Sequence, residues 1–326
     1  MPFLPLDAPG RAGAFQLVAT IGPASASLAA NLAAAGATAF RLNASHLSPA
    51  ELADALSRLD RDCPGAPVVV DLQGAKMRLG PALPREVSRA DLLRFGETDA
   101  DVLVPHRELF EQARVGDVLS VDDARVRFEV LSVTVGAIEA RALNGGRLLP
   151  RKGINLERHP VRLHGLTASD AEACRVSARH RASALAFSFM LDGSESAWLR
   201  AAAPRCRVVG KIERREAVHH LAGIAAHVDV VWVCRGDLGA QVGPAALARA
   251  VASIEPVHLA VPVLMAGQVL EHLTQHPEPT RSEVCHLFDL VARGYAGIVL
   301  SDETAVGRDP VHAVATAADL LASLRS

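Results

Sequence analysis

Two short apolar runs, each followed by charged residues, constrain the fold of this chain most. The first covers 208–212 (VVGKI) and is closed by Lys211 and Glu213, and the second covers 228–233 (VDVVWV) and is closed by Arg235 and Asp237. Buried strands that end in charge are typical of parallel α/β barrels, where the charged groups gather at the C-terminal rim. Lys211 and Glu213 are two residues apart, so both side chains leave one face of an extended strand.

Two interpretations of these strand ends stay open on spacing alone. Carboxylates arriving from neighbouring strands, Glu213 and Asp237, would suit Mg²⁺ or Mn²⁺, which also takes oxygens of a substrate. The alternative is an ordinary pair of strands whose charged ends are only solvated.

The same strand pattern recurs on both sides of a central interruption. Before residue 80, apolar runs at 16–21, 38–42 and 67–71 end in polar or charged residues, and after residue 152 five more runs follow, at 184–189, 208–212, 228–233, 261–266 and 297–300. Three strands and five make the eight that close an α/β barrel. We therefore expect an α/β fold, a (β/α)8 TIM barrel.

Capping signals place the first two helices of this barrel. Ser25 or Ser27 is expected to cap a helix that runs to Ala35,. Ser48, followed by Pro49 and Glu51, predicts the N-terminus of a second helix,.

The segment 80–152 lacks the βα alternation. Runs at 116–121, 126–130 and 137–143 predict strands joined by turns, and Asn144-Gly145-Gly146 is a strong turn signal,. We expect residues 1–79 and 153–326 to form the barrel, with 80–152 inserted after the third strand as a small antiparallel β domain. An insertion at a rim loop would act as a lid that excludes water.

Composition excludes several classes of protein. A net charge of −2 with mixed signs gives no field for nucleic acid or an anionic membrane,. The cysteines are five, widely spaced and without a C-x-x-C pair, which suits a reducing compartment,. No run of about 18 apolar residues and no signal-peptide pattern is present. We expect a soluble, cytoplasmic protein.

Ordered motifs then carry a resemblance to one family. They are VATIGPAS leading to RLNASH (18–46), DLQGAKMRLG (71–80), VDDA (121–124), NGG (144–146), RKGINL (151–156), FSF (187–189), GKIE (210–213), RGDLG (235–239), AGQVLE (266–271), HPEPTRSE (276–283) and LSDETAVG (300–307). In this order, over nearly the whole chain, the set resembles the pyruvate kinase family.

The resemblance implies Mg²⁺- or Mn²⁺-dependent phosphoryl transfer between phosphoenolpyruvate and ADP, giving pyruvate and ATP. The resemblance implies that Lys211 and Arg41 are catalytic and that Glu213 and Asp237 bind the divalent metal. The matched substrate positions are Ser188, Gly236, Asp237 and Gly267, and the nucleotide positions are Pro23, His46, Arg78 and Lys152. The matched positions of the monovalent-cation site are Asn43, Ser45 and Asp71, with Lys76 in the place of the cation. Asp122-Asp123 is either a hairpin turn or, as in the family, part of a lid over the nucleotide.

Four departures from the family pattern qualify this likeness. Leu72 and Lys76 resemble the members that need no K⁺, because a fixed ammonium replaces the bound cation. Gly267 stands where the family has a threonine hydroxyl near the substrate, and its absence would open space there. The family's C-terminal regulatory domain has no counterpart in this sequence, and the stretch 80–104 matches poorly.

Two other functions stay open beside the kinase. One is a metal-dependent lyase or aldolase that uses a pyruvate enolate, and the other is a non-catalytic relative that binds phosphoenolpyruvate. Small-molecule partners follow from each of them, and a homo-oligomer is possible because barrel helices often dimerise.

Overall fold

The computed structural model describes residues 15–81, 84–122, 124–157, 159, 161–180 and 182–324. The chain divides into two compact units. The first unit contains the chain up to Gly74 together with Gly165 onward, and the second contains Ala75–His164.

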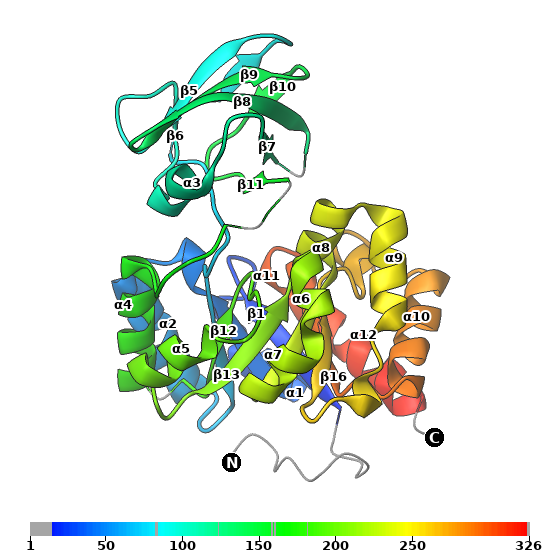
Figure 1. The fold of residues 1–326 in the computed structure, drawn as a ribbon. Helices are drawn as coiled ribbons and strands as arrows, with labels where there is room; N and C mark the ends of the chain where they lie inside the picture. The colour runs from blue at the N-terminus through cyan, green and yellow to red at the C-terminus, as the bar shows by residue number, and fades with distance from the viewer. Residues whose placement is uncertain are drawn as a thin grey trace. The chain divides into compact units, whose positions relative to one another are not determined.

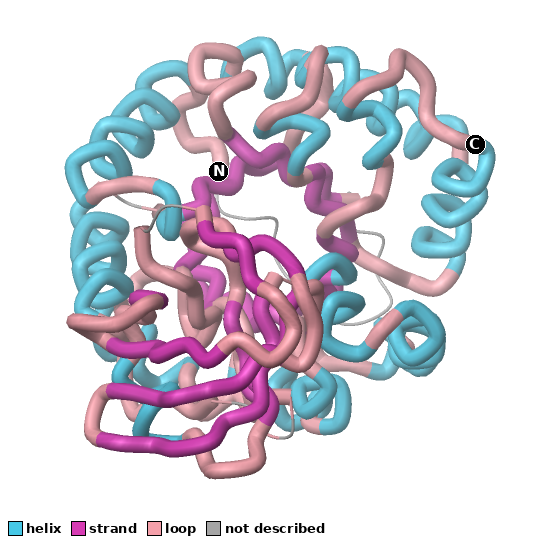
Figure 2. The backbone as a smooth tube through the Cα atoms, turned by 90° about the horizontal axis from the view of Figure 1, so that it is seen from above, coloured by secondary structure: helices cyan, strands magenta, loops and turns pink. Residues whose placement is uncertain are grey.

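The first unit is a closed barrel of eight parallel strands, in the spatial order β1-β16-β15-β14-β13-β12-β3-β2. Figure 2 shows the strands with helices outside them. The strands are β1 (Gln16–Ile21), β2 (Ala39–Asn43), β3 (Val68–Leu72), β12 (Ala184–Phe187), β13 (Arg207–Ile212), β14 (Val230–Cys234), β15 (Val263–Ala266) and β16 (Gly297–Leu300). The expected TIM barrel is confirmed, and each predicted strand of the barrel is present.

Helices follow the strands along the chain, as Figure 1 shows. They are α1 (Ala29–Ala34), α2 (Pro49–Asp62), α4 (Ala168–Arg179), α5 (Ser196–Ala202), α6 (Arg215–His219), α7 (Leu221–His227), α8 (Arg235–Val242), α9 (Pro244–Ser253), α10 (Arg281–Ala292), α11 (Asp302–Ala305) and α12 (Pro310–Ser323). Short 3-10 turns are η1 (Ala44–His46), η2 (Pro256–His258) and η3 (Glu271–Thr274).

The two capping predictions had different outcomes. Ser48 and Glu51 form the full capping box at the start of α2, as expected. The prediction that Ser25 or Ser27 caps α1 is wrong, because that helix begins later, after Leu28, and has no side-chain cap. Ser25 instead accepts the N–H of Gly22 and donates to a main-chain carbonyl of β1, so its hydroxyl closes the loop rather than the helix.

Alternate residues of the strands form the core inside the barrel. Val18, Ala39, Val69, Ala184, Ala186, Val209, Val230, Trp232, Cys234, Leu264, Ala266 and Val299 pack together there. The spacing of two between inner-face residues follows from the pleat of a strand. On several strands the inner-face residues nearest the C-terminal end are polar or charged. Those side chains therefore lie at the C-terminal end of the barrel, next to the apolar core.

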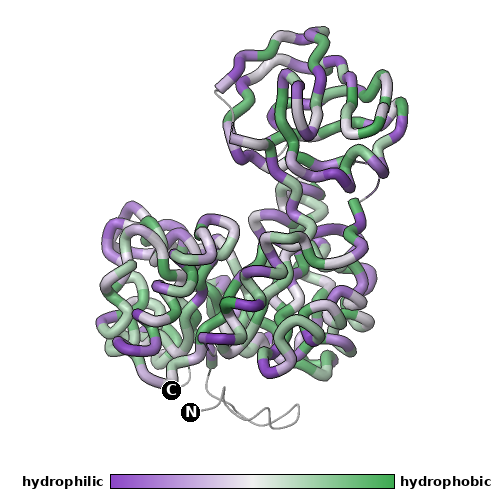
Figure 3. Tube along the Cα trace, turned by 90° about the vertical axis from the view of Figure 1, so that its left-hand side faces the viewer, coloured by the Kyte–Doolittle hydropathy of each residue, from purple (hydrophilic) through white to green (hydrophobic). Residues whose placement is uncertain are grey.

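The second unit is an antiparallel β domain inserted after β3. Its larger sheet has the order β11-β7-β8-β9-β5-β6, and β10 pairs with β4. The elements are β4 (Arg85–Val87), β5 (Leu92–Gly96), β6 (Val102–Leu103), α3 (Arg107–Gln112), β7 (Val118–Val121), β8 (Val126–Thr134), β9 (Ala137–Ala142), β10 (Gly146–Leu148) and β11 (Ile154–Leu156). Green and purple residues mix along this part of the trace in Figure 3, as expected for sheets with one buried face,.

Within the part of the chain that the structure describes, no helix has the length and apolar character needed to cross a membrane.

Candidate active site

The C-terminal ends of four barrel strands deliver one connected group of polar side chains. Arg41 lies on β2, Asp71 on β3, Lys211 on β13, and Ser188 follows β12 directly. Strand register explains why they meet: Asp71 is level with Asn43 on one side and with Ala186 on the other. Each of them follows an inner-face apolar residue by two positions, so the pleat turns it into the barrel.

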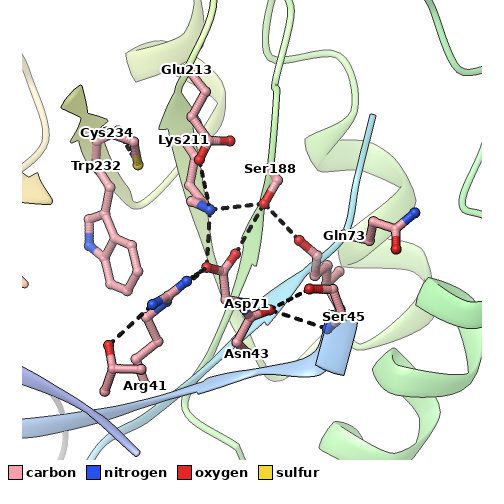
Figure 4. Close-up of polar contacts among 12 residues, drawn as sticks. Arg41, Asn43, Ser45, Asp71, Gln73, Ser188, Lys211, Glu213, Trp232 and Cys234 are labelled. Atoms are coloured by element: carbon pink, nitrogen blue, oxygen red, sulfur yellow. Dashed lines mark hydrogen bonds and ion pairs between the residues drawn. The ribbon is translucent and has the colours of Figure 1, made fainter. Parts of the chain in front are cut away.

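Lys211 is the centre of this group (Figure 4). Its Nζ lies 3.0 Å from Oδ2 of Asp71, 2.9 Å from Oγ of Ser188 and 2.9 Å from Oε1 of Glu213. An ammonium has three N–H donors, and three acceptors surround this one. The expected common face of Lys211 and Glu213 is therefore observed, and the ammonium is held in one orientation.

Arg41 holds the other side of Asp71. Its Nε donates to Asp71 Oδ2 across 2.8 Å and its Nη2 lies 2.6 Å from the same oxygen. Its Nη1 also donates to Oγ1 of Thr20, 3.1 Å away. Asp71 thus lies between two cations and has 1% of its surface exposed, which makes it the shared counter-ion of Lys211 and Arg41.

The ionisation of this group follows from its charges. Burial alone would raise the pKa of Asp71, but the charges of Lys211 and Arg41 outweigh it and hold that pKa below its usual value. Burial alone would lower the pKa of Lys211, yet Asp71 and Glu213 hold it above its usual value. Both shifts favour the charged forms, so the site keeps a fixed positive charge beside a fixed negative one.

Ser188 is one of the three acceptors around the Lys211 ammonium. Its hydroxyl is buried, donates to the main-chain oxygen of Leu72 across 2.8 Å and accepts from Lys211. Oδ1 of Asp71 lies 3.3 Å from the same hydroxyl, so Asp71 and the nearer Leu72 carbonyl are alternative acceptors for its single proton,. The structure thus shows Ser188 bound to the ammonium of Lys211.

Asn43 and Ser45 lie together at the end of β2. Oδ1 of Asn43 accepts both the N–H of Ser45 and its hydroxyl, at 3.2 and 2.7 Å. Asn43 is in register with Asp71 on β3. The three side chains matched to the monovalent-cation site therefore come from adjacent strand ends.

Glu213 and Asp237 are a donor set that suits a hard divalent cation. Glu213 directly follows β13, and Asp237 lies in the first turn of α8, just after the neighbouring strand β14. Among the described residues no three His, Cys, Asp or Glu groups are arranged to hold a metal. Two carboxylates are still enough for Mg²⁺, which completes its shell with water and substrate oxygens.

Glu213 is already well held. Its side chain has 1% of its surface exposed, and its Oε2 accepts the N–H of Phe189 across 2.7 Å. Phe189 has a φ of 57°, in the left-handed region. A bulky residue in this conformation is strained, and such strain persists where the surroundings fix it.

Gly236 and Gly267 lie next to each other at the ends of β14 and β15. A Cβ added at Gly267 would be 3.8 Å from the N of Gly236 and would meet no other described atom within 4 Å. A Cβ at Gly236 would meet nothing described within 4 Å. An added Cβ at either glycine would therefore meet no described side chain within 4 Å.

The remaining predicted residues belong to other segments of the chain. Pro23 and His46 are exposed, in the β1–α1 loop and in η1. Arg78, Lys152 and Lys76 belong to the second unit. There, Arg78 Nη1 donates to Arg151 O across 2.9 Å.

Asp122 also lies in the second unit. Lys152 Nζ lies 3.0 Å from its Oδ1, and Asp122 has a φ of 50°. The neighbouring Asp123 falls outside the described residues.

Sequence reasoning missed several groups that support the site. They are Thr20, Asp170, Phe189 and Arg235. Thr20 had a usable signal, since it is the one polar residue inside the apolar run 17–21. Phe189 and Arg235 fall within the FSF and RGDLG motifs, but the bonding partners of these two residues and of Asp170 depend on loop conformation.

Comparison with known proteins agrees with this geometry. A model of the family described as pyruvate kinase, barrel domain, matches residues 13–314. A pyruvate kinase of Agrobacterium vitis is 33% identical over 316 residues, covering 92% of this chain and 66% of the relative. A pyruvate kinase of Aeropyrum pernix is 32% identical over 315 residues, covering 93% and 69%.

An eight-stranded barrel with an inserted β domain and a lysine–carboxylate cluster at its rim defines the architecture, and the matched residues define the family. The chain belongs to the pyruvate kinase family. It spans about two thirds of the length of these curated relatives.

Proposed function

We propose that this protein transfers a phosphoryl group between phosphoenolpyruvate and ADP, giving pyruvate and ATP. The observation that supports it best is the Lys211 ammonium, held by Asp71, Ser188 and Glu213 beside the Arg41 guanidinium. Phosphoryl transfer needs little covalent chemistry from a protein and depends on positioning and charge neutralisation. Two preorganised cations at one rim supply both.

Each residue has a defined task in this proposal. The bond from phosphorus to the enol oxygen breaks while a bond to an ADP oxygen forms, and the enolate left behind takes a proton at carbon to become pyruvate. Lys211 stabilises the charge that develops on the enol oxygen, and Arg41 binds the oxygens of the phosphoryl group in transfer. The N–H groups of Gly236 and Asp237 bind the substrate carboxylate.

Glu213 and Asp237 would hold the divalent cation. Bound there, Mg²⁺ or Mn²⁺ would act as a Lewis acid toward substrate oxygens. The chain's own part is to keep the carboxylate oriented, through the N–H of Phe189, and to keep Lys211 charged beside it. Ser188 supports substrate binding by orienting that ammonium.

Nucleotide binding is proposed on the matched residues alone, Arg78, Lys152, Pro23 and His46. We infer that K⁺ is not required, because Lys76 supplies the fixed charge. The cysteines are free within the described chain, which supports the inferred reducing, cytoplasmic compartment,.

A coupled assay with phosphoenolpyruvate, ADP and Mg²⁺ tests the proposal. We expect pyruvate and ATP in equal amounts, and their loss in Glu213→Gln, which keeps the size of the side chain but not its charge. No ATP at high enzyme concentration, in a protein that binds Mn²⁺ normally, would contradict the kinase.

A second function, carbon–carbon bond chemistry on a pyruvate enolate, is favoured by one observation. The open space at Gly267, beside the Gly236 N–H, would admit a second carbonyl compound. Pyruvate-dependent consumption of aldehydes, without ADP, is the reaction to look for.

A further inference from the structure

Arg235 makes an unusual set of contacts between neighbouring strand ends. It is the first residue of α8, directly after β14, and both its Nε and its Nη2 donate to the carbonyl of Gly267, 3.2 Å away in each case. Nη2 also donates to the carbonyl of Gln268. Nη1 lies 2.8 Å from Nε2 of His286 on α10.

The turn that Arg235 holds is not a relaxed one. Gly267 and Gln268 have φ values of 74° and 56°, so two consecutive residues after β15 are left-handed. For a residue with a Cβ, such as Gln268, the left-handed region costs about 1–2 kcal/mol. A strained conformation persists only where its surroundings fix it, and here a guanidinium binds the carbonyls of both residues.

The far end of the same segment is fixed from the next strand. Oε1 of Glu303, on α11 just after β16, accepts the N–H of Leu270 across 3.2 Å. Its Oε2 accepts the N–H of Ser301 across 2.7 Å, and the side chain is buried. The segment 267–270 is thus held from β14 through Arg235 and from β16 through Glu303. Val269 and Leu270 are also fully buried.

The held turn borders the Gly236 N–H. A Cβ at Gly267 would lie 3.8 Å from that nitrogen, so the position of the turn decides how much room remains beside it. Arg235 is also the residue directly before Gly236, so the same side chain that fixes the turn anchors the start of α8.

We propose that Arg235 is a positioning residue: it holds the Gly267–Gln268 turn and the start of α8 at a fixed separation, and so keeps the Gly236 N–H free and aimed for the substrate carboxylate. This inference rests on the proposed function, in which that N–H binds the carboxylate of phosphoenolpyruvate. A carboxylate is bound equally before and during phosphoryl transfer, so loosening its site raises KM more than it lowers kcat.

Arg235→Lys tests the proposal, because lysine keeps the charge but cannot reach both carbonyls and His286 with a rigid fork. We expect KM for phosphoenolpyruvate to rise about tenfold, with kcat within about threefold. A hydrogen bond to a charged group, here from the Gly236 N–H to the substrate carboxylate, contributes roughly a tenfold difference in affinity. Amide hydrogen exchange in the segment 267–272 is expected to become faster.

Arg293→Lys is the matched control. The Arg293 guanidinium also binds main-chain carbonyls, those of Val251, Ala252 and Ile254, but at the end of α9 rather than at the strand-end turn. It is expected to lower the free energy of unfolding without changing KM or exchange at 267–272.

Substitutions of His286 test the same role of Arg235 with a smaller change, because they affect only the contact of its Nη1. His286→Leu removes the acceptor of Nη1 alone and should raise KM and exchange by smaller factors, whereas His286→Gln keeps an acceptor and should restore both. This pair decides the matter if Arg235→Lys does not fold.

The outcomes separate the two proposals. Unchanged exchange at 267–272 in Arg235→Lys overturns the positioning role, whatever the activity. Faster exchange with an unchanged KM, or an unchanged Kd for phosphoenolpyruvate by calorimetry where turnover is absent, overturns it as well. A wild-type protein without turnover, in which exchange and Kd respond as expected, contradicts the kinase and supports the positioning role.

Discussion

Lys211 Nζ and Glu213 Oε1 are 2.9 Å apart at the end of one strand. A cation proposed for catalysis therefore shares a carboxylate with the proposed metal site. The two charges compete for the same oxygen, because Mg²⁺ prefers carboxylate oxygens and an ammonium repels it. Changes of Lys211 and of Glu213 should therefore affect turnover and metal affinity differently.

Lys211→Met is expected to reduce turnover by about 10²- to 10³-fold or more, as loss of a charge stabiliser does. Mn²⁺ affinity, measured by electron paramagnetic resonance, should be equal to wild type or higher, because a competing positive charge is gone. The free energy of unfolding should fall by roughly 3 kcal/mol, since a buried ion pair loses one partner. Weaker Mn²⁺ binding in a folded variant would place the metal away from Glu213.

Lys76→Glu is expected to create a requirement for K⁺. The wild-type protein should be equally active in Na⁺, K⁺ and tetramethylammonium buffers, because the fixed ammonium takes the place of the cation. The variant should be active in K⁺ only, by initial-rate measurement at saturating substrate. Lys152→Glu is the matched charge reversal, and it should raise KM for ADP without creating a K⁺ requirement. A wild-type protein that is inactive in Na⁺ buffer would refute the role of Lys76.

Much of the fold was predictable because strand ends, turns and the period of two are local properties. The three lysines of the chain, Lys76, Lys152 and Lys211, all fall at motif positions, and the place of Lys211 at the end of a strand followed from its local sequence. The Ser48 cap was predictable for the same local reason, because the side chains of Ser48 and Glu51 each accept the main-chain N–H of the other.

What was not predictable depends on contacts between distant segments. Arg235 matched a motif, yet its bonds to Gly267 and Gln268 exist only because β14 and β15 pair. Phe189 gave no sign of its left-handed conformation, which is stabilised by Glu213 on the next strand. In the second unit, β4, β5 and β6 were missed because they lie in a stretch without clear alternation.

Asp170 should make stability depend on pH. Its carboxyl accepts the N–H groups of Gln73 and Gly74, at 3.0 Å each, and is 2% exposed. Burial, opposed by its hydrogen bonds and aided by the charge of Asp71, raises the pKa of Asp170 from 3.8 to about 6. Cys174 also lies near it, but burial raises the pKa of that thiol to about 12, so it stays neutral.

The sign follows from proton binding. Between pH 3.8 and about 6 the folded state binds more protons than the unfolded state, so this contribution is fully present below pH 3.8 and is lost as pH rises through 6,. The loss amounts to at most about 3 kcal/mol. Urea unfolding from pH 4 to 7 should show that Asp170→Asn and Asp170→Ala both lack this decline, while differing from each other by a constant offset. Curves parallel to wild type would rule out Asp170 as the titrating group.

Gly267→Thr should destabilise the protein instead of restoring a family feature. At a φ of 74° a β-branched residue is an outlier, and the cost is about 1–3 kcal/mol,. Gly165→Thr is the matched control, because its φ lies outside the left-handed region and a Cβ there would meet no described atom within 4 Å. Urea unfolding should show a large loss for the first variant and little for the second, with no gain in activity in either.

A double-mutant cycle then asks what holds Gly267 in this conformation. If Arg235 fixes the turn, Gly267→Thr should cost less in an Arg235→Lys background, because the released backbone can leave the left-handed region and accept the threonine. The coupling between the two changes should be about 1 kcal/mol or more, as found for residues in direct contact. Strictly additive effects would mean that the turn is set by its own sequence, and a rise in kcat for Gly267→Thr alone would show that the backbone adapts freely.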